Sequence, residues 1–201
     1  MSVKVFTVRD IIAGPTKALA VASSPRQRTI LRNFIRHGML EVAGRWDEIL
    51  TPEMVIDQPR YRIFEGGQQH ELEGLDQIGA FYAELTGQGL NVFGPLDETV
   101  FVSDWGLAIE SLMGSHLTGQ QAVAIGYPQA DPSGFYQLTR YISSFWPYAE
   151  DCRLIGEHIY ENTGSRHLER ISEAQYVSPE AARDQLADLI EESRDWRGEL
   201  N

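Results

Sequence analysis

The chain has 201 residues, a formal net charge of −12 and 42% hydrophobic residues. This length and composition are typical of one soluble globular domain that can bury a core. The negative charge argues against nucleic acid or an anionic membrane surface as a partner, because both select surfaces rich in Lys and Arg. The single cysteine, Cys152, rules out an intrachain disulfide, and we interpret it as a small hydrophobe rather than a nucleophile.

Neither a targeting segment nor a membrane span is expected. The first 25 residues lack a basic start followed by an unbroken apolar run, so they do not resemble a signal peptide. No apolar run approaches the ~18 residues of a transmembrane helix. The expected compartment is therefore the cytoplasm.

The first elements in chain order are an arm and a long helix. Residues 3–12, "VKVFTVRDII", predict a strand or an extended arm that stops at the Gly-Pro pair 14–15. A helix is predicted to begin at Pro25, with Ser24 as its N-cap, and to end before Gly44. Apolar residues recur at helical spacing between these limits.

The middle of the chain predicts short elements. Residues 46–52, "WDEILTP", predict a second, short helix, and residues 53–64 are rich in strand formers. Pro59 indicates a bulge or an edge strand. Residues 65–74, "EGGQQHELEG", are interpreted as a turn region. The amphipathic stretch 74–85, "GLDQIGAFYAEL", predicts the next helix.

The second half changes to strands. A hairpin is predicted over 98–119, with its turn at 104–106, and a long connection follows over 119–134. A second hairpin is predicted over 135–162, turning near 149–152.

The tail predicts an added helix with Ser178 as its cap and Pro179 in its first turn. Helices, a strand, a helix and then an antiparallel meander make up the predicted order. This order indicates the α+β class rather than the alternating pattern of a parallel sheet.

Common motifs that bind metals or cofactors, or that carry a nucleophilic serine, are absent from the sequence. It contains no H-E-x-x-H, paired C-x-x-C, P-loop or G-x-S-x-G. No two histidines are four residues apart, so a metal site would need long-range convergence. We expect neither a metal nor an organic cofactor. The five histidines are His37, His70, His116, His158 and His167.

Four segments together resemble the nuclear-transport-factor-2-like superfamily, which includes SnoaL-like polyketide cyclases and ketosteroid isomerase. "EVAGRWDEILTPEMVIDQP" resembles the family's helix, Gly turn, short helix and strand ending at Pro. "EGLDQIGAFY" resembles its G-x-x-x-I-x-x-F-Y helix. "GLAIESLMGSHLTG" resembles the strand ending in G-T-H-x-G, and "DCRLIGEHIYEN" resembles the closing strand.

The resemblance covers residues 25–165. It implies a curved antiparallel β-sheet wrapped around N-terminal helices into an open cone, with a homodimer formed through the outer sheet face. An N-terminal arm, 1–24, and a C-terminal extension with a helix, 166–201, lie outside it.

Because a fold alone does not give a function, each functional position of the family is matched separately to a residue of this sequence. In the isomerase pattern, the oxyanion donor falls on His37, and the Tyr that supports this donor falls on Tyr82. The base position falls on Gln58, which cannot act as a base, and its neighbour Asp57 is the available carboxylate. The second acid falls on the serine pair 143–144, so ordinary ketosteroid isomerisation is not expected.

The cyclase pattern places its histidine on His116 and its acid on the same serine pair. Strand alternation puts Arg140 and Ser144 on one face of 136–144, either facing the cone or on the outside of the sheet. An inward Arg140 would need a carboxylate or an anionic ligand. The closing strand offers Glu161, on the same face as Glu157.

These positions define the predicted site. The predicted catalytic residues are His37, Tyr82, Arg140 and Glu161. The predicted pocket residues are Asp57, Gln58, Tyr61, Phe81, Ser144 and His116. Each also has a plain structural interpretation: His37 and His116 as solvated, Tyr82 as a core aromatic and Glu161 as a surface carboxylate. Glu41 is interpreted as part of a solvated helix face.

The first functional hypothesis is a cofactor-independent lyase, isomerase or dehydratase. It would act on a small apolar, aromatic (phenolic) or polycyclic oxygenated molecule, for example as a diarylpropane-type lyase. His37 with Tyr82 would move a proton or hold an oxyanion, and Arg140 would hold a phenolate, enolate or carboxylate. The alternatives are a non-catalytic ligand-binding or protein-interaction module, an auxiliary subunit, and a polyketide cyclase or epoxide hydrolase-like enzyme.

Overall fold

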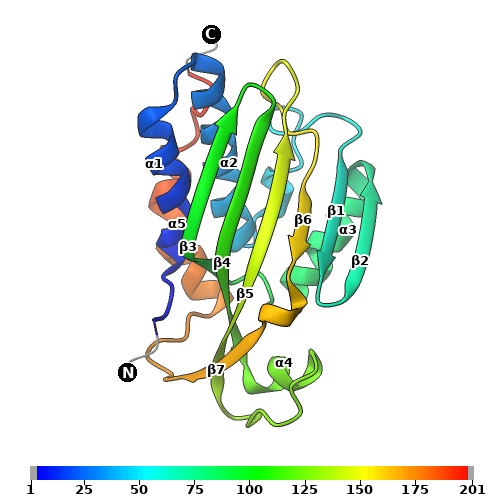
Figure 1. Ribbon diagram of the computed structural model, residues 1–201, viewed down its shortest axis with the longest axis vertical. Helices are drawn as coiled ribbons and strands as arrows, with labels where there is room; N and C mark the ends of the chain where they lie inside the picture. The colour runs from blue at the N-terminus through cyan, green and yellow to red at the C-terminus, as the bar shows by residue number, and fades with distance from the viewer. Residues whose placement is uncertain (1–3, 199–201) are drawn as a thin grey trace.

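The computed structural model describes residues 4–198, in which seven strands form one curved sheet (Figure 1). The spatial order is β2-β1-β6-β5-β4-β3, and β7 pairs with β5 beside β6. All neighbours are antiparallel except β1 and β6, which are parallel. The strands are β1 (Arg60–Glu65), β2 (Gln68–Glu73), β3 (Phe93–Ser103), β4 (Gly106–Thr118), β5 (Phe135–Pro147), β6 (His158–Glu161) and β7 (His167–Ile171).

Helices cover one side of this sheet. The longest, α2, packs against α1, α5, β3 and β4, and it lies behind the sheet in the view of Figure 1. The helices are η1 (Val8–Ile12), α1 (Ala13–Val21), α2 (Pro25–Val42), η2 (Trp46–Glu48), α3 (Gly74–Gly87), α4 (Gly119–Ala124), η3 (Thr163–Ser165) and α5 (Pro179–Glu192). The α+β class predicted from the sequence is confirmed.

Local sequence signals explain the limits of α2. The Ser24 side chain accepts a hydrogen bond from the backbone N–H of Gln27, and Pro25 occupies the first turn, where its missing N–H costs nothing. Gly44 follows the helix with φ +66°, a conformation that favours glycine. The predicted start and end of this helix are both confirmed.

The hairpin turn predicted at 104–106 and the helix predicted over 74–85 are also confirmed. The region 65–74 is corrected, because it holds the strand β2. Gly66 and Gly67 both have positive φ and form a two-residue hairpin turn, as type I′ geometry requires. Because β2 lies exposed at the edge of the sheet, its side chains are mostly charged or polar. The sequence of β2 therefore lacks the alternating apolar residues that would predict a strand.

Other predicted element boundaries also differ from those in the structure. The Gly-Pro pair 14–15 lies in the first turn of α1 rather than ending a strand, because proline is tolerated there. Residues 8–12 form a short 3₁₀ helix, and residues 1–3 of the predicted arm lie outside the described residues. The helix predicted over 46–52 is only the 3₁₀ turn η2, and the connection 119–134 contains α4.

The C-terminal segment is part of the main core. The predicted helix is present as α5, but β7, which no signal had indicated, also lies beyond residue 165. Leu186 and Ile190 of α5 are buried in the same apolar cluster as α2 and the sheet. Arg9 of the N-terminal segment forms an ion pair with Asp188 on the exposed side of α5. Residues 199–201 lie outside the described residues.

Both terminal segments meet at His116, which is buried near the end of β4. The His116 Nδ1 atom accepts a hydrogen bond from the backbone N–H of Val177 at 3.0 Å. The ring of Phe6 packs 4.3 Å from the imidazole, centre to centre. Burial lowers the pKa of His116 to about 4, so the imidazole is neutral at physiological pH.

The outer face of the sheet exposes Phe101, Tyr141 and Phe145. Homodimer formation through this face stays a prediction. None of the helices in residues 4–198 has both the length and the apolar character needed to cross a bilayer.

The packing of α5 leads to a stability prediction. Leu186→Ala should lower the free energy of unfolding by about 2–5 kcal/mol, because it leaves a cavity in the main core. Urea denaturation measures this change. Gln185→Ala, at the exposed neighbouring position, is the control and should change stability by less than about 0.5 kcal/mol. Equally small effects of both substitutions would show that α5 is not part of the cooperative core.

Candidate functional site

A cavity of about 140 Å³ lies between α2 and the inner face of the sheet. Its walls are mostly apolar and aromatic, with Phe34 from α2, Phe81 from α3 and Trp146 from β5 among them. A few polar groups interrupt these walls. They are Glu41, Glu65, Glu98, Ser111, Arg140, Ser144 and Glu157. An apolar cavity with a few converging polar groups is the usual form of a small-molecule site.

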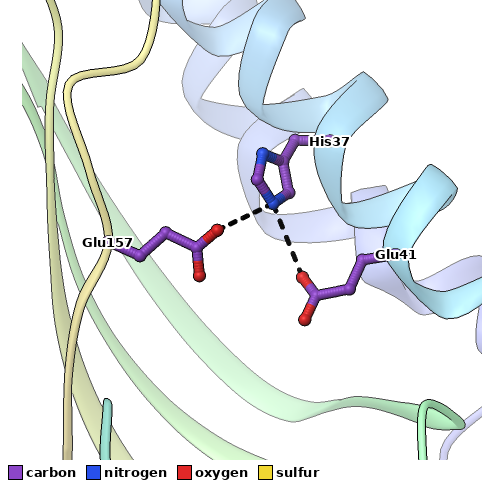
Figure 2. Close-up of side chains that lie close together, drawn as sticks. All are labelled: His37, Glu41 and Glu157. Carbon is purple, nitrogen blue, oxygen red and sulfur yellow. Dashed lines mark ion pairs between the residues drawn. The ribbon is translucent and has the colours of Figure 1, made fainter. Parts of the chain in front are cut away.

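The innermost polar group is a cluster around His37 (Figure 2). The His37 Nε2 atom lies 2.9 Å from Glu157 Oε1 and 3.6 Å from Glu41 Oε2. The Tyr82 hydroxyl donates a hydrogen bond of 2.6 Å to Glu157 Oε1 and lies 3.1 Å from His37 Nε2. The structure thus brings His37 and Tyr82 together and adds two carboxylates.

Secondary structure explains how these side chains meet. His37 and Glu41 are four residues apart on α2, so they project from the same face of the helix. Glu157 lies just before β6, where its carbonyl oxygen accepts a hydrogen bond from the backbone N–H of Arg62. Tyr82 comes from the buried side of α3. Three separate segments of the chain therefore meet at His37.

The residues of the His37 cluster shift one another's pKa values. Burial alone would lower the pKa of His37, but the charges and hydrogen bonds of Glu157 and Glu41 outweigh burial and raise this pKa to about 9. Burial raises the pKa of Glu41 to about 7, with the Glu157 charge adding to the rise and His37 opposing it. Burial and the Glu157 charge raise the pKa of the Tyr82 hydroxyl well above its ordinary value. At neutral pH the imidazole is therefore a cation, the phenol stays a donor, and Glu41 is close to its midpoint.

His37 does not line the cavity; the two carboxylates do. The imidazole is fully buried behind them, which excludes the interpretation of His37 as a solvated helix-end residue. Among residues 4–198, its Nδ1 atom finds no hydrogen-bond partner. His37 therefore acts on a ligand only through Glu41 and Glu157.

The same cluster has a donor set that suits a divalent metal. One ligand atom each from His37, Glu41 and Glu157 lies within 4.8 Å of the others. Imidazole and carboxylate are ordinary ligands of zinc and iron. A metal-bound histidine normally donates its second ring N–H to a neighbour, and Nδ1 of His37 has no such acceptor in the part of the chain described.

Arg140 faces the cavity, so the interpretation that it lies on the outside of the sheet is wrong. Its Nε and Nη2 atoms donate to Glu65 Oε1 at 3.2 and 3.1 Å, and Nη1 donates to the Ser115 hydroxyl at 2.8 Å. Arg140 and Glu65 also line an adjoining outer hollow of about 490 Å³. The arginine therefore stands between the cavity and this outer hollow.

The predicted pairing of Arg140 with Glu161 is wrong. The strand β6 ends at Glu161, which lies opposite Ile142, so Arg140 is beyond the end of this strand. Glu161 instead binds the Arg166 guanidinium and accepts a hydrogen bond from the Gly66 N–H. Burial opposes ionisation of Glu161, but Arg166 and Gly66 outweigh it and lower its pKa.

The predicted pocket residues divide into two groups. Phe81 and Ser144 line the cavity, and Tyr61 is buried beside Tyr82, with its ring perpendicular to that of Tyr82. Asp57 and Gln58 are exposed, because β1 begins only at Arg60 and the segment before it turns outward. Asp57 forms an ion pair with Arg153 at 3.4 Å.

His116 is neither a pocket residue nor solvent-facing, since it lies under Phe6 and Val177 as described above.

Sequence reasoning missed three carboxylates of the cavity: Glu41, Glu65 and Glu98. Glu41 was interpreted as solvated, but its position one helical turn from His37 could have indicated that it lies on the same helix face as His37. The signal for Glu98 was its alternation with apolar Val100 and Val102, which places it on the inner face of β3. Glu65 is the last residue of β1, and the strand predicted from the sequence ended one residue earlier, so no signal pointed to it.

Comparison with known proteins supports the fold. A crystal structure named as a SnoaL-like polyketide cyclase from Jannaschia sp. CCS1 aligns with a TM-score of 0.50 and 15% identity, over 70% of this chain and 90% of that chain. Bal32a, from a soil-derived mobile gene cassette, aligns with a TM-score of 0.44 and 13% identity, over 69% and 92%. Neither a protein-family model nor a curated protein matches the sequence. The cone fold predicted from the sequence resemblance is confirmed, and at this identity the likeness concerns the fold alone.

The His37 cluster leads to a stability prediction. At pH 7, His37→Gln should lower the free energy of unfolding by about 3 kcal/mol, because it leaves two buried carboxyl groups without their cation. The stabilisation from the raised pKa of His37 is complete below pH 6.5 and is lost as the pH rises through about 9. The difference between wild type and variant should therefore shrink between pH 7 and 9.5.

Urea denaturation at both pH values measures this difference. His167→Gln, at an exposed histidine, is the matched control and should show little effect at either pH. A difference that stays constant from pH 7 to 9.5 would contradict the assignment of a buried imidazolium.

Proposed function

We propose that this protein is a cofactor-independent enzyme that moves protons on a small, neutral, oxygenated molecule with one apolar ring. The reaction class is elimination or isomerisation, as in a lyase, dehydratase or isomerase. The observation that carries the proposal is Glu41, a carboxyl group in an apolar cavity whose pKa is raised to about 7 by burial. A general acid or base is most effective when its pKa lies near the working pH.

The residues around Glu41 support this role. As a carboxylate, Glu41 can remove a proton from a carbon next to a carbonyl group, and as an acid it can return one. The His37 imidazolium, 3.6 Å from Glu41 and 2.9 Å from Glu157, holds both carboxyl groups in place. Tyr82 fixes the Glu157 oxygen that faces His37. His37 and Tyr82 are thus positioning residues, and Glu41 and Glu157 are the groups within reach of a ligand.

The size of the cavity supports a compact ligand. An apolar cavity of about 150 Å³ is known to hold benzene, and this cavity measures about 140 Å³. One six-membered ring fits this space, whereas a polycyclic skeleton does not. A diarylpropane could place only one ring inside, with the remainder in the outer hollow next to Arg140.

The partners of Arg140 favour a neutral ligand. Its guanidinium is already paired with Glu65 and bonded to Ser115. A paired arginine can still donate to a carbonyl or hydroxyl oxygen, but it offers little net charge to a phenolate or carboxylate. We therefore propose that Arg140 orients a neutral oxygen near the opening of the cavity.

Turnover of a substrate panel tests the proposal. EDTA-treated protein would be incubated with monocyclic hydroxyketones, enones, phenols and epoxides, and products followed by mass spectrometry. Glu41→Gln should lower kcat/KM by about 10²–10⁴-fold, the usual contribution of a general base. In the wild type, kcat/KM should rise with pH through about 7, as Glu41 ionises.

Glu110→Gln, a carboxyl group on the outer face of β4, is the matched control and should leave turnover unchanged. Turnover that survives EDTA and falls only in Glu41→Gln supports the proposal. Turnover that requires added Zn²⁺ or Mg²⁺ would assign His37, Glu41 and Glu157 as metal ligands instead. A ligand that binds in the cavity without turnover would favour the non-catalytic binding module.

A further inference from the structure

We propose that Ser144 and Glu157 form a subsite for one neutral hydroxyl group of the ligand, in which Ser144 donates to the hydroxyl oxygen and Glu157 accepts its hydrogen. This inference deepens the proposed function, on which it rests, because it names the substrate class. The substrate is a monocyclic alcohol or phenol, so the hydroxyketones and phenols of the substrate panel should bind better than the enones and epoxides.

The Ser144 hydroxyl group lies on an apolar part of the cavity wall. Ser144 is only 5% exposed, and the next residues on the inner face of β5, Ile142 and Trp146, line the same cavity. A hydroxyl group buried in such a wall costs free energy unless it is hydrogen-bonded. A serine at this position therefore needs partners both for its oxygen and for its hydrogen.

Trp146 fixes the direction of the Ser144 hydroxyl group. The Trp146 Nε1 atom donates a hydrogen bond to Ser144 Oγ at 3.0 Å. The indole ring contacts two other rings, with its centre 4.9 Å from that of Phe34 and 5.1 Å from that of His37. The hydrogen of Ser144 has no acceptor among residues 4–198. Because serine carries one donor, this donor is left for a ligand oxygen in the cavity.

Glu157 supplies an acceptor on the same wall. His37 and Tyr82 both bind its Oε1 atom, so its Oε2 atom is not used by either. Tyr61 lies near this carboxylate, but its hydroxyl group makes no hydrogen bond within the part of the chain described. Glu157 lines the cavity, and its Oε2 atom can therefore accept a hydrogen from a ligand.

The pairing of β5 with β6 places the two groups near each other. Ser144 lies directly opposite Ile159, and Glu157 is two residues before Ile159 on the same inner face. Ser144 and Glu157 are therefore diagonal neighbours, which lie about 7 Å apart in a regular antiparallel pair. A ligand hydroxyl group between them can accept a hydrogen bond from Ser144 and donate one to Glu157.

The same position brings the ligand to the proposed base. One carboxylate oxygen of Glu157 and one of Glu41 lie within 4.8 Å of each other. A ring whose hydroxyl group is held by Ser144 and Glu157 therefore has its neighbouring carbon beside Glu41.

The donor and the acceptor together select a hydroxyl group. An ether or epoxide oxygen can accept from Ser144, but it has no hydrogen for Glu157. An ionised oxygen also lacks this hydrogen, and the carboxylate of Glu157 would repel it. The two cations beside the cavity, His37 and Arg140, are already paired and do not offset this repulsion. A site with buried polar groups rejects analogues that leave these groups unpaired.

Binding of phenol and fluorobenzene tests the subsite without turnover. The two molecules are nearly equal in size, but only phenol has a hydroxyl hydrogen. Wild-type protein should bind phenol more tightly than fluorobenzene, although phenol loses hydrogen bonds with water. In Ser144→Ala, the ratio of the phenol affinity to the fluorobenzene affinity should fall by about 10-fold, as expected for one lost hydrogen bond. Titrations followed by NMR at pH 7 measure both dissociation constants.

The Trp146 Nε1–H resonance is a second readout, assigned by its absence in Trp146→Phe. When Ser144 donates to phenol, its Oγ atom becomes a stronger acceptor for Trp146, because hydrogen bonds in a chain polarise one another. The resonance should therefore move further downfield with phenol than with fluorobenzene, and a merely structural serine would not produce this difference.

Ser143→Ala, the same substitution at the exposed neighbouring position, is the control and should alter neither readout. Fluorobenzene binding by Ser144→Ala shows that the variant is folded and has kept its cavity. If Ser144→Ala binds neither molecule, Ser144→Cys takes its place, because a thiol is similar in shape but a weak donor.

The outcomes separate the two proposals. Phenol selection that depends on Ser144, without turnover that depends on Glu41, supports the subsite and contradicts the proposed function. Turnover that depends on Glu41, without phenol selection, overturns the subsite and keeps the proposed function. An equal affinity ratio in wild type and the Ser144 variants overturns the inference, and so does failure of the wild type to bind either molecule.

Discussion

The ion pair between His37 and Glu157 is the interaction on which the interior of this protein depends. It joins α2 to the segment before β6, and the Tyr82 hydroxyl adds α3 to the same carboxylate oxygen. Burying a carboxylate without compensation costs several kcal/mol, so Glu157 needs both donors. Glu41 and Glu157 can therefore both lie in the interior of the cone because an imidazolium lies behind them.

This arrangement separates the task of holding charge from that of meeting a ligand. His37 and Tyr82 are fully buried behind the wall, whereas Glu41 and Glu157 reach the cavity surface. Apolar walls from Phe34, Phe81 and Trp146 lower the local dielectric constant and strengthen every electrostatic interaction inside. The same burial raises the pKa of Glu41 and Glu98 toward neutrality, which is the condition for proton transfer at physiological pH.

Most local signals that rest on stereochemistry agree with the structure, although the Gly-Pro pair 14–15 lies in the first turn of α1 instead of ending a strand. Ser24 with Pro25 and Gly44 marked both ends of α2, and the Asp-Trp-Gly tripeptide marked the turn between β3 and β4. Signals that rested on polarity were less reliable. The edge strand β2 is almost entirely polar, so its sequence predicts a turn, and Glu41 lies on a polar helix face that predicts a solvated residue although it faces the cavity.

The sequence by itself determined the α+β class and the helical position of His37, because these follow from periodicity, caps and the order of the segments. The cone fold was implied by the resemblance of four segments to a known superfamily. Only the tertiary structure decided which charges meet. Arg140 is paired with Glu65 rather than Glu161 because β6 ends before it reaches the level of Arg140. Likewise, Glu41, Glu98 and Glu157 come from a helix, a strand and a loop far apart in the chain. Periodicity gives the face on which each side chain lies, but the register and curvature of the sheet determine which faces enclose the same cavity.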